Sequence, residues 1–315
     1  MLKTLFLWMA PVLALGIILL SATYIRDIHR AHERVSAAGT VIASPYGDIE
    51  YTDAGSGPPV LVIHGSGGGY DQGELIAQAV LSADFHVVTP SRFGYLRSAI
   101  RENATWDEQA HAYAFLLDHL QIDKVAVVAM SHGGPSALLL ALLHPERVSS
   151  LTLISCGVAP SASSDQAEAN EKGEILTSIF KYDLLYWVIS KFAKSQFMEL
   201  MGANDEVVAG LTRSQRQVIE RIIDYMNPVS LRSAGVSFDN KAKLPGERIA
   251  AIRAPTLVLH AEDDTLQLFH NAEFAASKIP DARLISFEAG GHVVMIVEQA
   301  TVRPGVQRHI LTHLN

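Results

Sequence analysis

Apolar positions follow two different patterns along the chain. Between Lys3 and Arg26, 22 consecutive residues carry no charge (TLFLWMAPVLALGIILLSATYI). As a helix this run would span about 33 Å, which is enough to cross the hydrocarbon core of a bilayer. From about Thr40 onward, short apolar runs of strand length alternate with longer helical patterns. This alternation predicts an α/β fold in which a mostly parallel sheet carries helices on both faces.

The uncharged run is predicted to be a retained transmembrane helix that makes this a single-pass membrane protein. A cleaved signal peptide is the alternative, although its apolar region is usually only about 7–15 residues long. A buried helix of the core is a further alternative. Arg26, Arg30 and Arg34 follow the run, and this positive flank favours a cytoplasmic position for the part of the chain that follows. Residues 26–38 are predicted to form a polar helical linker.

Eight short apolar runs bounded by turn residues are predicted to be strands. Several of them, such as VLVIH and VAVVAM, are continuously apolar, as expected for strands buried on both faces. A capping box beginning at Thr105 opens a predicted helix over 106–120, and the apolar run 137–143 is expected to be a second helix. The predicted strands are 40–44, 48–53, 60–64, 87–90, 125–130, 151–155, 256–260 and 284–287.

The alternation is interrupted between Val158 and Gly246, where no strong strand signal occurs. Helical patterns are found there instead, and they cover 165–180, 183–201 and 212–226, with a shorter one near Val229. We therefore predict a helical lid inserted into a core. The predicted segments are an anchor and linker over 1–38, the first part of the core over 39–157, the lid over 158–246, and the second part of the core over 247–315.

Composition narrows the classes of function. Hydrophobic residues make up 49% of the chain and charged residues 18%, which excludes a disordered protein. The formal net charge of −8 argues against a nucleic-acid partner. Cys156 is the single cysteine, so neither an internal disulfide nor a cysteine-based metal site is predicted. No metal or cofactor is expected, and the sequence leaves the oligomeric state open.

The strongest chemical signal is Ser131, at a junction of strand, turn and helix. The run 125–130 leads into SHGGP and then into an apolar helix. Such a turn exposes the serine hydroxyl, and small residues two positions before and after it, here Ala129 and Gly133, permit close approach of strand and helix. The helix N-terminus adds a positive dipole near developing negative charge. Ser131 is therefore a candidate nucleophile.

With this junction the chain resembles the α/β-hydrolase superfamily over residues 40–315, with Ala129 where the family usually has glycine. The resemblance extends to the loop HGSGGG at 64–69, which directly follows a predicted strand. In similar proteins this loop supplies one backbone N–H of the oxyanion hole. The resemblance therefore implies Ser66 as one donor and His132, just after the nucleophile, as the second.

The resemblance also implies partners for Ser131. The acid of the family follows a late strand, which here is TLVLH followed by AEDD. That position points to Asp264, with Asp263 as the alternative. Two glycines precede His292, and small residues there let a loop histidine reach into the site. Ser131, Asp264 and His292 occur in the chain order that this superfamily uses.

These residues imply a serine hydrolase that cleaves a carboxylic ester of a small to medium, hydrophobic substrate through an acyl-enzyme. Hydrolases that cleave C–C bonds in ring-fission products use the same triad and are one alternative. A protein of this fold that binds a ligand without turnover is another. A serine nucleophile excludes the aspartate chemistry of dehalogenases and epoxide hydrolases.

Three further features are expected to be mainly structural. Arg92 and Tyr95, in the loop after the strand 87–90, are interpreted as structural rather than substrate-binding. Cys156, at a strand end near the predicted site, is interpreted as a small core residue. The aromatic and methionine side chains of the lid are expected either to line an apolar pocket or to pack the lid onto the core.

Overall fold

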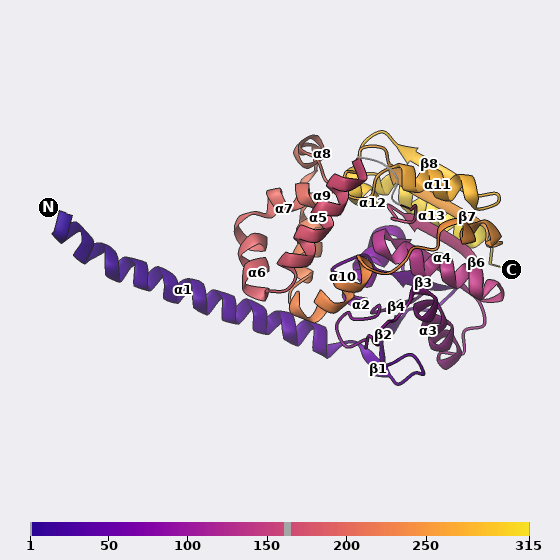
Figure 1. The fold of residues 1–315 in the computed structure, drawn as a ribbon, viewed down its shortest axis with the longest axis horizontal. Helices are drawn as coiled ribbons and strands as arrows, with labels where there is room; N and C mark the ends of the chain where they lie inside the picture. The colour runs from indigo at the N-terminus through magenta and orange to yellow at the C-terminus, as the bar shows by residue number, and fades with distance from the viewer. Residues whose placement is uncertain (1, 161–164, 315) are drawn as a thin grey trace.

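The computed structural model describes residues 2–160 and 165–314, with side chains described over 11–160 and 171–314. Figure 1 shows a body in which helices surround a central sheet and a second group of helices packs beside them. One long helix, α1 (Leu2–Ala37), projects away from this body and carries the N-terminus at its far end.

An eight-stranded sheet forms the centre of the body, in the order β1-β2-β4-β3-β5-β6-β7-β8. β2 pairs antiparallel with β1 and β4, and every other pair is parallel. Each predicted run is a strand whose ends lie within a few residues of the prediction, so the α/β fold class is confirmed. The strands are β1 (Thr40–Ile42), β2 (Ile49–Ala54), β3 (Pro59–Ile63), β4 (His86–Pro90), β5 (Val125–Met130), β6 (Val148–Ile154), β7 (Thr256–Ala261) and β8 (Arg283–Phe287).

Side chains of the sheet alternate between two apolar cores, one on each face. Leu61 and Ile63 of β3 belong to the first core, whereas Val60 and Val62 belong to the second, and all four are fully buried. The central strands are continuously apolar because both faces are covered. Helices α3 (Trp106–His119), α4 (Gly134–Leu143) and α11 (His270–Lys278) pack into the first core, and α2 (Tyr70–Val80), α12 (Val294–Val297) and α13 (Gln299–Thr312) into the second.

Among the described residues between β6 and β7 there are six α-helices, and we call them the lid. The single helix expected over 183–201 is wrong, because the structure breaks it at Ala193, where φ is −137° and ψ is 36°. Phe192 is exposed before the break, whereas Phe197 is buried after it, so the break turns the second helix inward. The lid helices are α5 (Asp165–Ile179), α6 (Asp183–Phe192), α7 (Lys194–Leu200), α8 (Asp205–Gly210), α9 (Arg213–Tyr225) and α10 (Ser233–Asp239).

Helix α1 continues without interruption from the uncharged run into the predicted linker. Within the described residues, its stretch Pro11–Ala37 is long and apolar enough to cross a membrane by length and composition, and none of its most apolar window is buried. The linker is helical as predicted, but it is not free of the body. Ala31 and Val35 are buried, and just before the linker the ring of Tyr24 packs edge-on against Trp187 of α6 at 5.4 Å.

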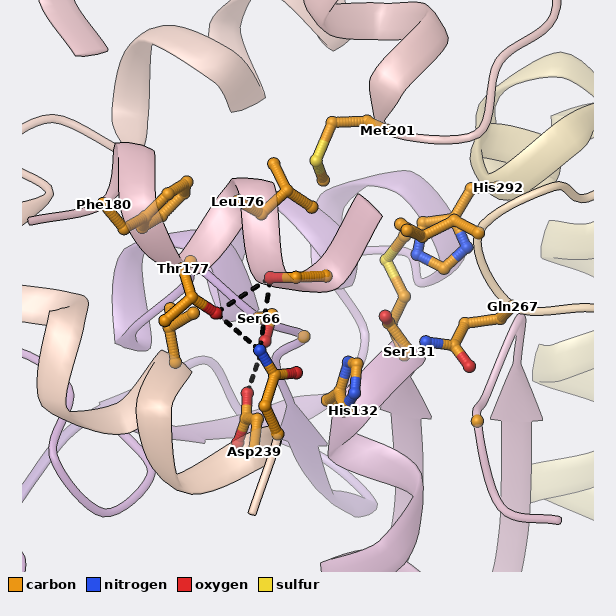
Figure 2. Close-up of a pocket in the computed structure, with 18 of the residues that line it drawn as sticks. Ser66, Ser131, His132, Leu176, Thr177, Phe180, Met201, Asp239, Gln267 and His292 are labelled. Atoms are coloured by element: carbon orange, nitrogen blue, oxygen red, sulfur yellow. Dashed lines mark hydrogen bonds between the residues drawn. The ribbon is translucent and has the colours of Figure 1, made fainter. Parts of the chain in front are cut away.

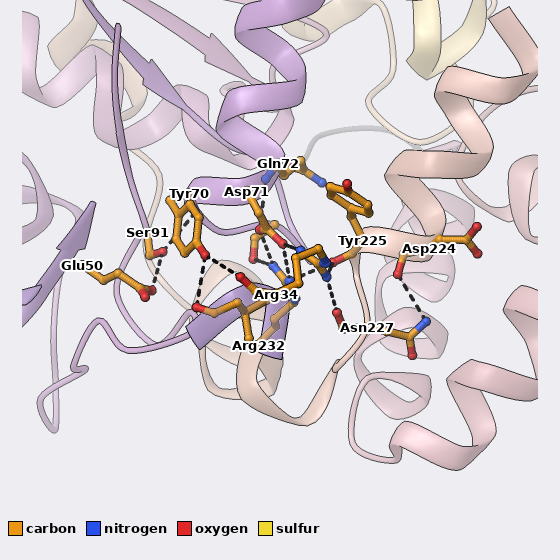
Figure 3. Close-up of polar contacts among 12 residues, drawn as sticks. Arg34, Glu50, Tyr70, Asp71, Gln72, Ser91, Asp224, Tyr225, Asn227 and Arg232 are labelled. Atoms are coloured by element: carbon orange, nitrogen blue, oxygen red, sulfur yellow. Dashed lines mark hydrogen bonds and ion pairs between the residues drawn. The ribbon is translucent and has the colours of Figure 1, made fainter. Parts of the chain in front are cut away.

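A polar cluster fixes the end of α1 to the body, and we call it the Arg34 junction (Arg34, Asp71, Tyr225, Asn227 and Arg232; Figure 3). Arg34 pairs with Asp71 of α2 and donates to the carbonyl oxygens of Tyr225 at 2.9 Å and Asn227 at 2.6 Å. Arg232 pairs with the same carboxylate at 2.8 Å. Burial alone would raise the pKa of Asp71, but the guanidinium groups of Arg232 and Arg34 lower it to about 2. The junction therefore joins α1, α2 and the lid through one ionised carboxylate.

Candidate active site

Ser131 lies where β5 gives way to α4, in a strained turn. Its φ is 53°, in the left-handed region that few non-glycine residues adopt, and the residue is buried. The loop after β3 presses against it, because a Cβ on Gly65 would lie 2.9 Å from the Cβ of Ser131. Pro135 occupies the first turn of α4, where a backbone N–H would have no helical acceptor, so its absence costs no hydrogen bond. The junction predicted from the sequence is therefore present.

Asp264 and His292 meet in the segments that follow β7 and β8. The Nδ1 atom of His292 lies 2.9 Å from the Oδ2 atom of Asp264. The other carboxylate oxygen of Asp264 accepts from the backbone N–H groups of Leu266 and Gln267, each at 2.9 Å. Burial alone would raise the pKa of Asp264, but His292 and the neighbouring His260 lower it below its usual range. The carboxylate is thus held ionised with one oxygen aimed at the imidazole.

The loop that carries His292 is held by the lid and by Asp263. The N–H of His292 donates to the carbonyl of Gly202, in the lid, at 3.0 Å. Asp263 accepts from the N–H of Gly291 at 2.7 Å and from the side chain of Asn204 at 2.9 Å. Gly291 has a φ of 53° and meets the Gly202 carbonyl so closely that a Cβ would lie 2.3 Å from it. The alternative acid, Asp263, therefore positions the loop backbone.

The glycine-rich loop beside Ser131 is fixed at several points. The N–H of Gly65 donates to the side-chain oxygen of Gln72 at 3.0 Å, and Arg232 of the Arg34 junction donates to the carbonyl of Gly68. Ser66 and His132 both line the cavity that Ser131 and His292 also line (Figure 2). The two candidate oxyanion donors thus belong to residues that share a cavity with the candidate nucleophile.

Asp239, at the end of α10, is a site residue that the sequence did not reveal. It accepts two hydrogen bonds from Arg92, at 2.6 and 2.7 Å, and both side chains are fully buried. One oxygen of Asp239 also accepts from the hydroxyls of Ser66 and Tyr95, each at 2.5 Å. Burial alone would raise the pKa of Asp239, but Arg92 lowers it. Arg92 and Tyr95 therefore have a structural role: both donate to the Asp239 carboxylate, which in turn accepts from Ser66.

A cavity of about 750 Å³ lies between the core and the lid. Figure 2 shows His292 and Ser131 at one side of it, with Leu176, Phe180 and Met201 contributed by the lid. Among the described residues that line the cavity, Lys241 is the one lysine or arginine. Over residues 2–160 and 165–314, no group of three or more histidine, cysteine, aspartate or glutamate side chains could hold a metal ion. The further lining side chains that are apolar include Met130, Met198, Ile219, Ile222, Ile223, Met226, Val236, Leu266, Val293 and Met295.

Cys156 follows β6 beside the turn of Ser131. It is buried, and its thiol lies 3.4 Å from the carbonyl oxygen of Ala129. Burial raises the pKa of Cys156 to about 12, so the thiolate is scarce at neutral pH. These observations agree with the interpretation of Cys156 as a small core residue.

Comparisons with known proteins agree with this fold. The family model of the alpha/beta hydrolase fold matches residues 58–299. An uncharacterized hydrolase, YcgS of Bacillus subtilis, is 29% identical over 264 residues, which cover 81% of this chain and 91% of the relative. A 2-hydroxy-6-oxo-6-phenylhexa-2,4-dienoate hydrolase of Burkholderia cepacia is 28% identical over 256 residues, or 78% of this chain and 84% of the relative.

The solved structure of a membrane phospholipase A, a bacterial virulence factor, superimposes with a TM-score of 0.67 at 21% identity, covering 99% of each chain. At this identity the likeness concerns the fold, and its coverage includes α1. The chain therefore belongs to the α/β-hydrolase fold family and is a hydrolase of that family.

Proposed function

We propose that the protein is a serine hydrolase that cleaves a carboxylic ester, with Ser131 as nucleophile, His292 as base and Asp264 as its orienting acid. The proposal is carried by the 2.9 Å contact between His292 and Asp264, together with a serine held at a φ of 53° that lines the same cavity as His292. A serine hydroxyl is a weak nucleophile, and this arrangement supplies the base and the fixed imidazole that it needs.

The proposed reaction has two halves. The Oγ atom of Ser131 attacks the ester carbonyl while its proton passes to the Nε2 atom of His292, and Asp264 stabilises the resulting imidazolium. The carbonyl oxygen becomes an oxyanion that accepts from the backbone N–H groups of Ser66 and His132. Collapse of this intermediate expels the alcohol, which takes the proton from His292 and leaves an acyl-serine. Water then attacks the acyl carbon, gives a proton to His292 and releases the acid.

The cavity favours a neutral, hydrophobic ester of small to medium size. Most of the large side chains that the lid contributes to the described lining are methionine, isoleucine, leucine or phenylalanine, so the cavity would bury an acyl chain rather than solvate a charge. Asp239 accepts from the Ser66 hydroxyl and is already occupied by four hydrogen bonds, two of them from Arg92, so it is not available to bind a substrate group.

Hydrolysis of a C–C bond is the second candidate, because the Burkholderia cepacia relative acts on a dienoate and is 28% identical. A dienoate carries a carboxylate, which proteins usually bind with arginine or lysine. Lys241 is the one such residue in the described lining, and it is exposed. The chemistry of the lining therefore favours the ester.

The test is a panel of p-nitrophenyl esters of increasing acyl length, assayed with the full-length protein, with Ser131→Ala and with Ser237→Ala as matched control. Ser237 lines the same cavity but lies outside the proposed triad. We expect hydrolysis and fluorophosphonate labelling to disappear in Ser131→Ala and to persist in Ser237→Ala. Faster cleavage of a ring-fission dienoate than of any ester would support the C–C candidate. Absence of turnover and of labelling in the wild-type protein would favour a ligand-binding role.

We further propose that α1 is retained as a membrane anchor. Seven apolar side chains between Val12 and Leu20 are between 44% and 71% exposed, which water disfavours and lipid accepts. Resistance of the full-length protein to carbonate extraction from cell membranes is the expected result. If mass spectrometry shows that the mature protein lacks the uncharged run between Lys3 and Arg26, that result would instead support a cleaved signal peptide.

A further inference from the structure

Helix α6 of the lid turns an apolar face to the outside of the molecule. Leu184, Leu185, Val188 and Phe192 are between 38% and 69% exposed. At about 100° per residue, these four side chains fall within roughly 100° of the helix circumference, so they form one stripe. The opposite face, with Tyr186 among others, is buried in the lid. A helix with apolar side chains on both faces requires an apolar partner outside the body.

The position of α6 indicates what that partner is. α6 lies beside α1 in Figure 1, and the contact spans the end of the uncharged run, from Tyr24 to Asp27. Trp187 of α6 packs on Tyr24 and donates from its ring nitrogen to Asp27 at 3.2 Å. Lys191 of α6 pairs with the same carboxylate at 3.0 Å. α6 is therefore attached to α1 at the level where an apolar span gives way to charged residues.

That level corresponds to the interface of a bilayer crossed by α1. Tryptophan and tyrosine are enriched at this depth because their rings are apolar and their polar tips reach water. Arg26 and Arg30 of α1 are exposed there, as is Lys181 just before α6. Basic side chains at this depth are attracted to anionic headgroups. The exposed apolar stripe and the surrounding basic residues thus match one chemistry, that of a lipid surface.

We propose that the exposed face of α6 docks into the interfacial region of the bilayer that α1 crosses. This proposal rests on the proposed membrane anchoring by α1. The stripe on α6 would lie among the headgroups and upper acyl chains, as in other amphipathic helices that lie in a membrane plane.

The Arg34 junction attaches α1 to the rest of the body, so α6 cannot change its depth independently of α1. Arg34 joins α1 to Asp71 of α2 and to the lid segment at Tyr225 and Asn227 (Figure 3). Its guanidinium also lies 4.1 Å from the centre of the Tyr225 ring. Because α1 is a single helix from the run to this junction, no flexible linker separates the membrane span from the lid. The depth of α6 is therefore set by α1.

The inner face of α6 reaches the wall of the cavity. The ring of Tyr186 packs edge-on against Phe180 at 5.3 Å and against Phe197 at 5.4 Å. Phe180 lines the cavity that contains Ser131. The helix α6 thus lies between the proposed lipid contact and the proposed substrate pocket. We therefore expect loss of the lipid contact to weaken the hydrolysis of substrates that partition into lipid.

Fluorescent labels placed by cysteine substitution test the docking without requiring activity. Cys156 is buried, and its raised pKa of about 12 makes it unreactive, so an introduced cysteine is labelled selectively. The sites are Leu185→Cys on α6, Ile18→Cys in the uncharged run, and Glu273→Cys as a control on α11, which Figure 1 places at the opposite end of the body from α1. Full-length protein is reconstituted into phosphatidylcholine–phosphatidylglycerol vesicles that contain nitroxide lipids, with the quencher either near the headgroup or near the bilayer centre.

We expect the label at 185 to shift to the blue and to lose most of its fluorescence to the quencher near the headgroup. The label at 18 should respond more strongly to the quencher near the bilayer centre, and the label at 273 to neither. A label at 185 that behaves like the one at 273, while the label at 18 is quenched, would overturn the docking and leave the anchoring intact. A label at 18 that is not quenched would overturn both. A blue shift at 185 without quenching would show that protein covers the face, which also overturns the proposal.

A kinetic measurement adds a functional readout. Leu184→Ser combined with Phe192→Ser is compared with Leu311→Ser, whose side chain is 53% exposed on α13. We expect the double variant to have a several-fold higher KM for a long-chain ester embedded in vesicles, with kcat/KM for a soluble short-chain ester unchanged. An equal effect on both esters, or on neither, would contradict the docking. If the wild-type protein hydrolyses neither ester, the proposed function fails while the labelling experiment still decides the docking.

Discussion

Replacement of Asp239 by alanine is expected to destabilise both the fold and the candidate oxyanion loop. The substitution removes four hydrogen bonds, two from Arg92 and one each from Ser66 and Tyr95. It also leaves the Arg92 guanidinium fully buried without its counter-charge. Breaking one partner of a buried ion pair costs about 3–5 kcal/mol, a large share of the roughly 5–15 kcal/mol that stabilises a typical domain.

The measurement is urea unfolding in detergent micelles, followed by tryptophan fluorescence. Trp106 is a suitable reporter because its ring lies 5.6 Å from the Arg92 guanidinium. We expect Asp239→Ala to lower the free energy of unfolding by about 3–5 kcal/mol, and Asp281→Asn, an exposed control, to leave it unchanged within about 0.5 kcal/mol. A double variant, Arg92→Met with Asp239→Leu, should lose less than Asp239→Ala because no charge is left unpaired.

Asp239→Ala is also expected to lower kcat for ester hydrolysis. Ser66 loses the acceptor that fixes its side chain, so its backbone N–H is less well placed to stabilise an oxyanion. Removing an oxyanion donor outright costs about 10²–10³ in kcat, and misplacing one should cost less. Asp239→Ala with unaltered stability would refute the argument that this ion pair is structurally required. Lowered stability with unaltered kcat would refute the link to Ser66 alone.

Three further expectations concern the triad and the Arg34 junction. Asp264→Asn should lower kcat for ester hydrolysis by about 10⁴-fold, because His292 would lose its orienting acceptor; an effect below tenfold would contradict the proposed acid. Arg34→Ala should lower the free energy of unfolding by about 1–3 kcal/mol, since two carbonyl oxygens lose a donor. The exposed control Arg30→Ala should leave it unchanged. Equal thermal melts of the two variants would contradict the attachment of α1 to the body. Because the pKa of Asp71 is lowered to about 2, against about 3.9 in an unfolded chain, its stabilising contribution is present above about pH 4 and lost as the pH falls toward 2. Urea titrations at successive pH values should show that decline, and Asp71→Asn should flatten it.

The sheet and the triad candidates could be predicted from the sequence because their signals are local. A strand buried on both faces is continuously apolar, and the residue after a parallel strand lies at its carboxyl end. Ser131 directly follows β5, and Asp264 follows β7 closely. The resemblance to the α/β-hydrolase superfamily implied that Asp264 and His292, 28 positions apart, would meet, and the structure brings them to 2.9 Å. Their catalytic roles, and the boundaries of the four predicted segments, stay predictions.

The features that the sequence did not reveal depend on contacts between distant segments. Asp239 is 147 positions from Arg92, and no periodicity connects a lid carboxylate to a loop arginine. The only available hint was Arg92 itself, because an arginine at a strand end near a pocket requires an anionic partner. The sequence does not show the break at Ala193, because the apolar pattern continues across it and only the direction of burial changes. It does not show the contacts of the linker either, because residues 26–38 are mostly polar and their partners lie on α2 and in the lid.

The unbroken course of α1 has a mechanical consequence in a membrane. An apolar span that does not match the bilayer thickness tilts or deforms the bilayer at a cost of a fraction of a kcal/mol per Å. A flexible linker would dissipate that strain, whereas α1, if anchored as proposed, would deliver it to Arg34 and through Asp71 to Arg232, which also holds the carbonyl of Gly68. Hydrophobic mismatch would then be coupled to the loop beside Ser131. We therefore expect lipid chain length to affect the geometry of this site.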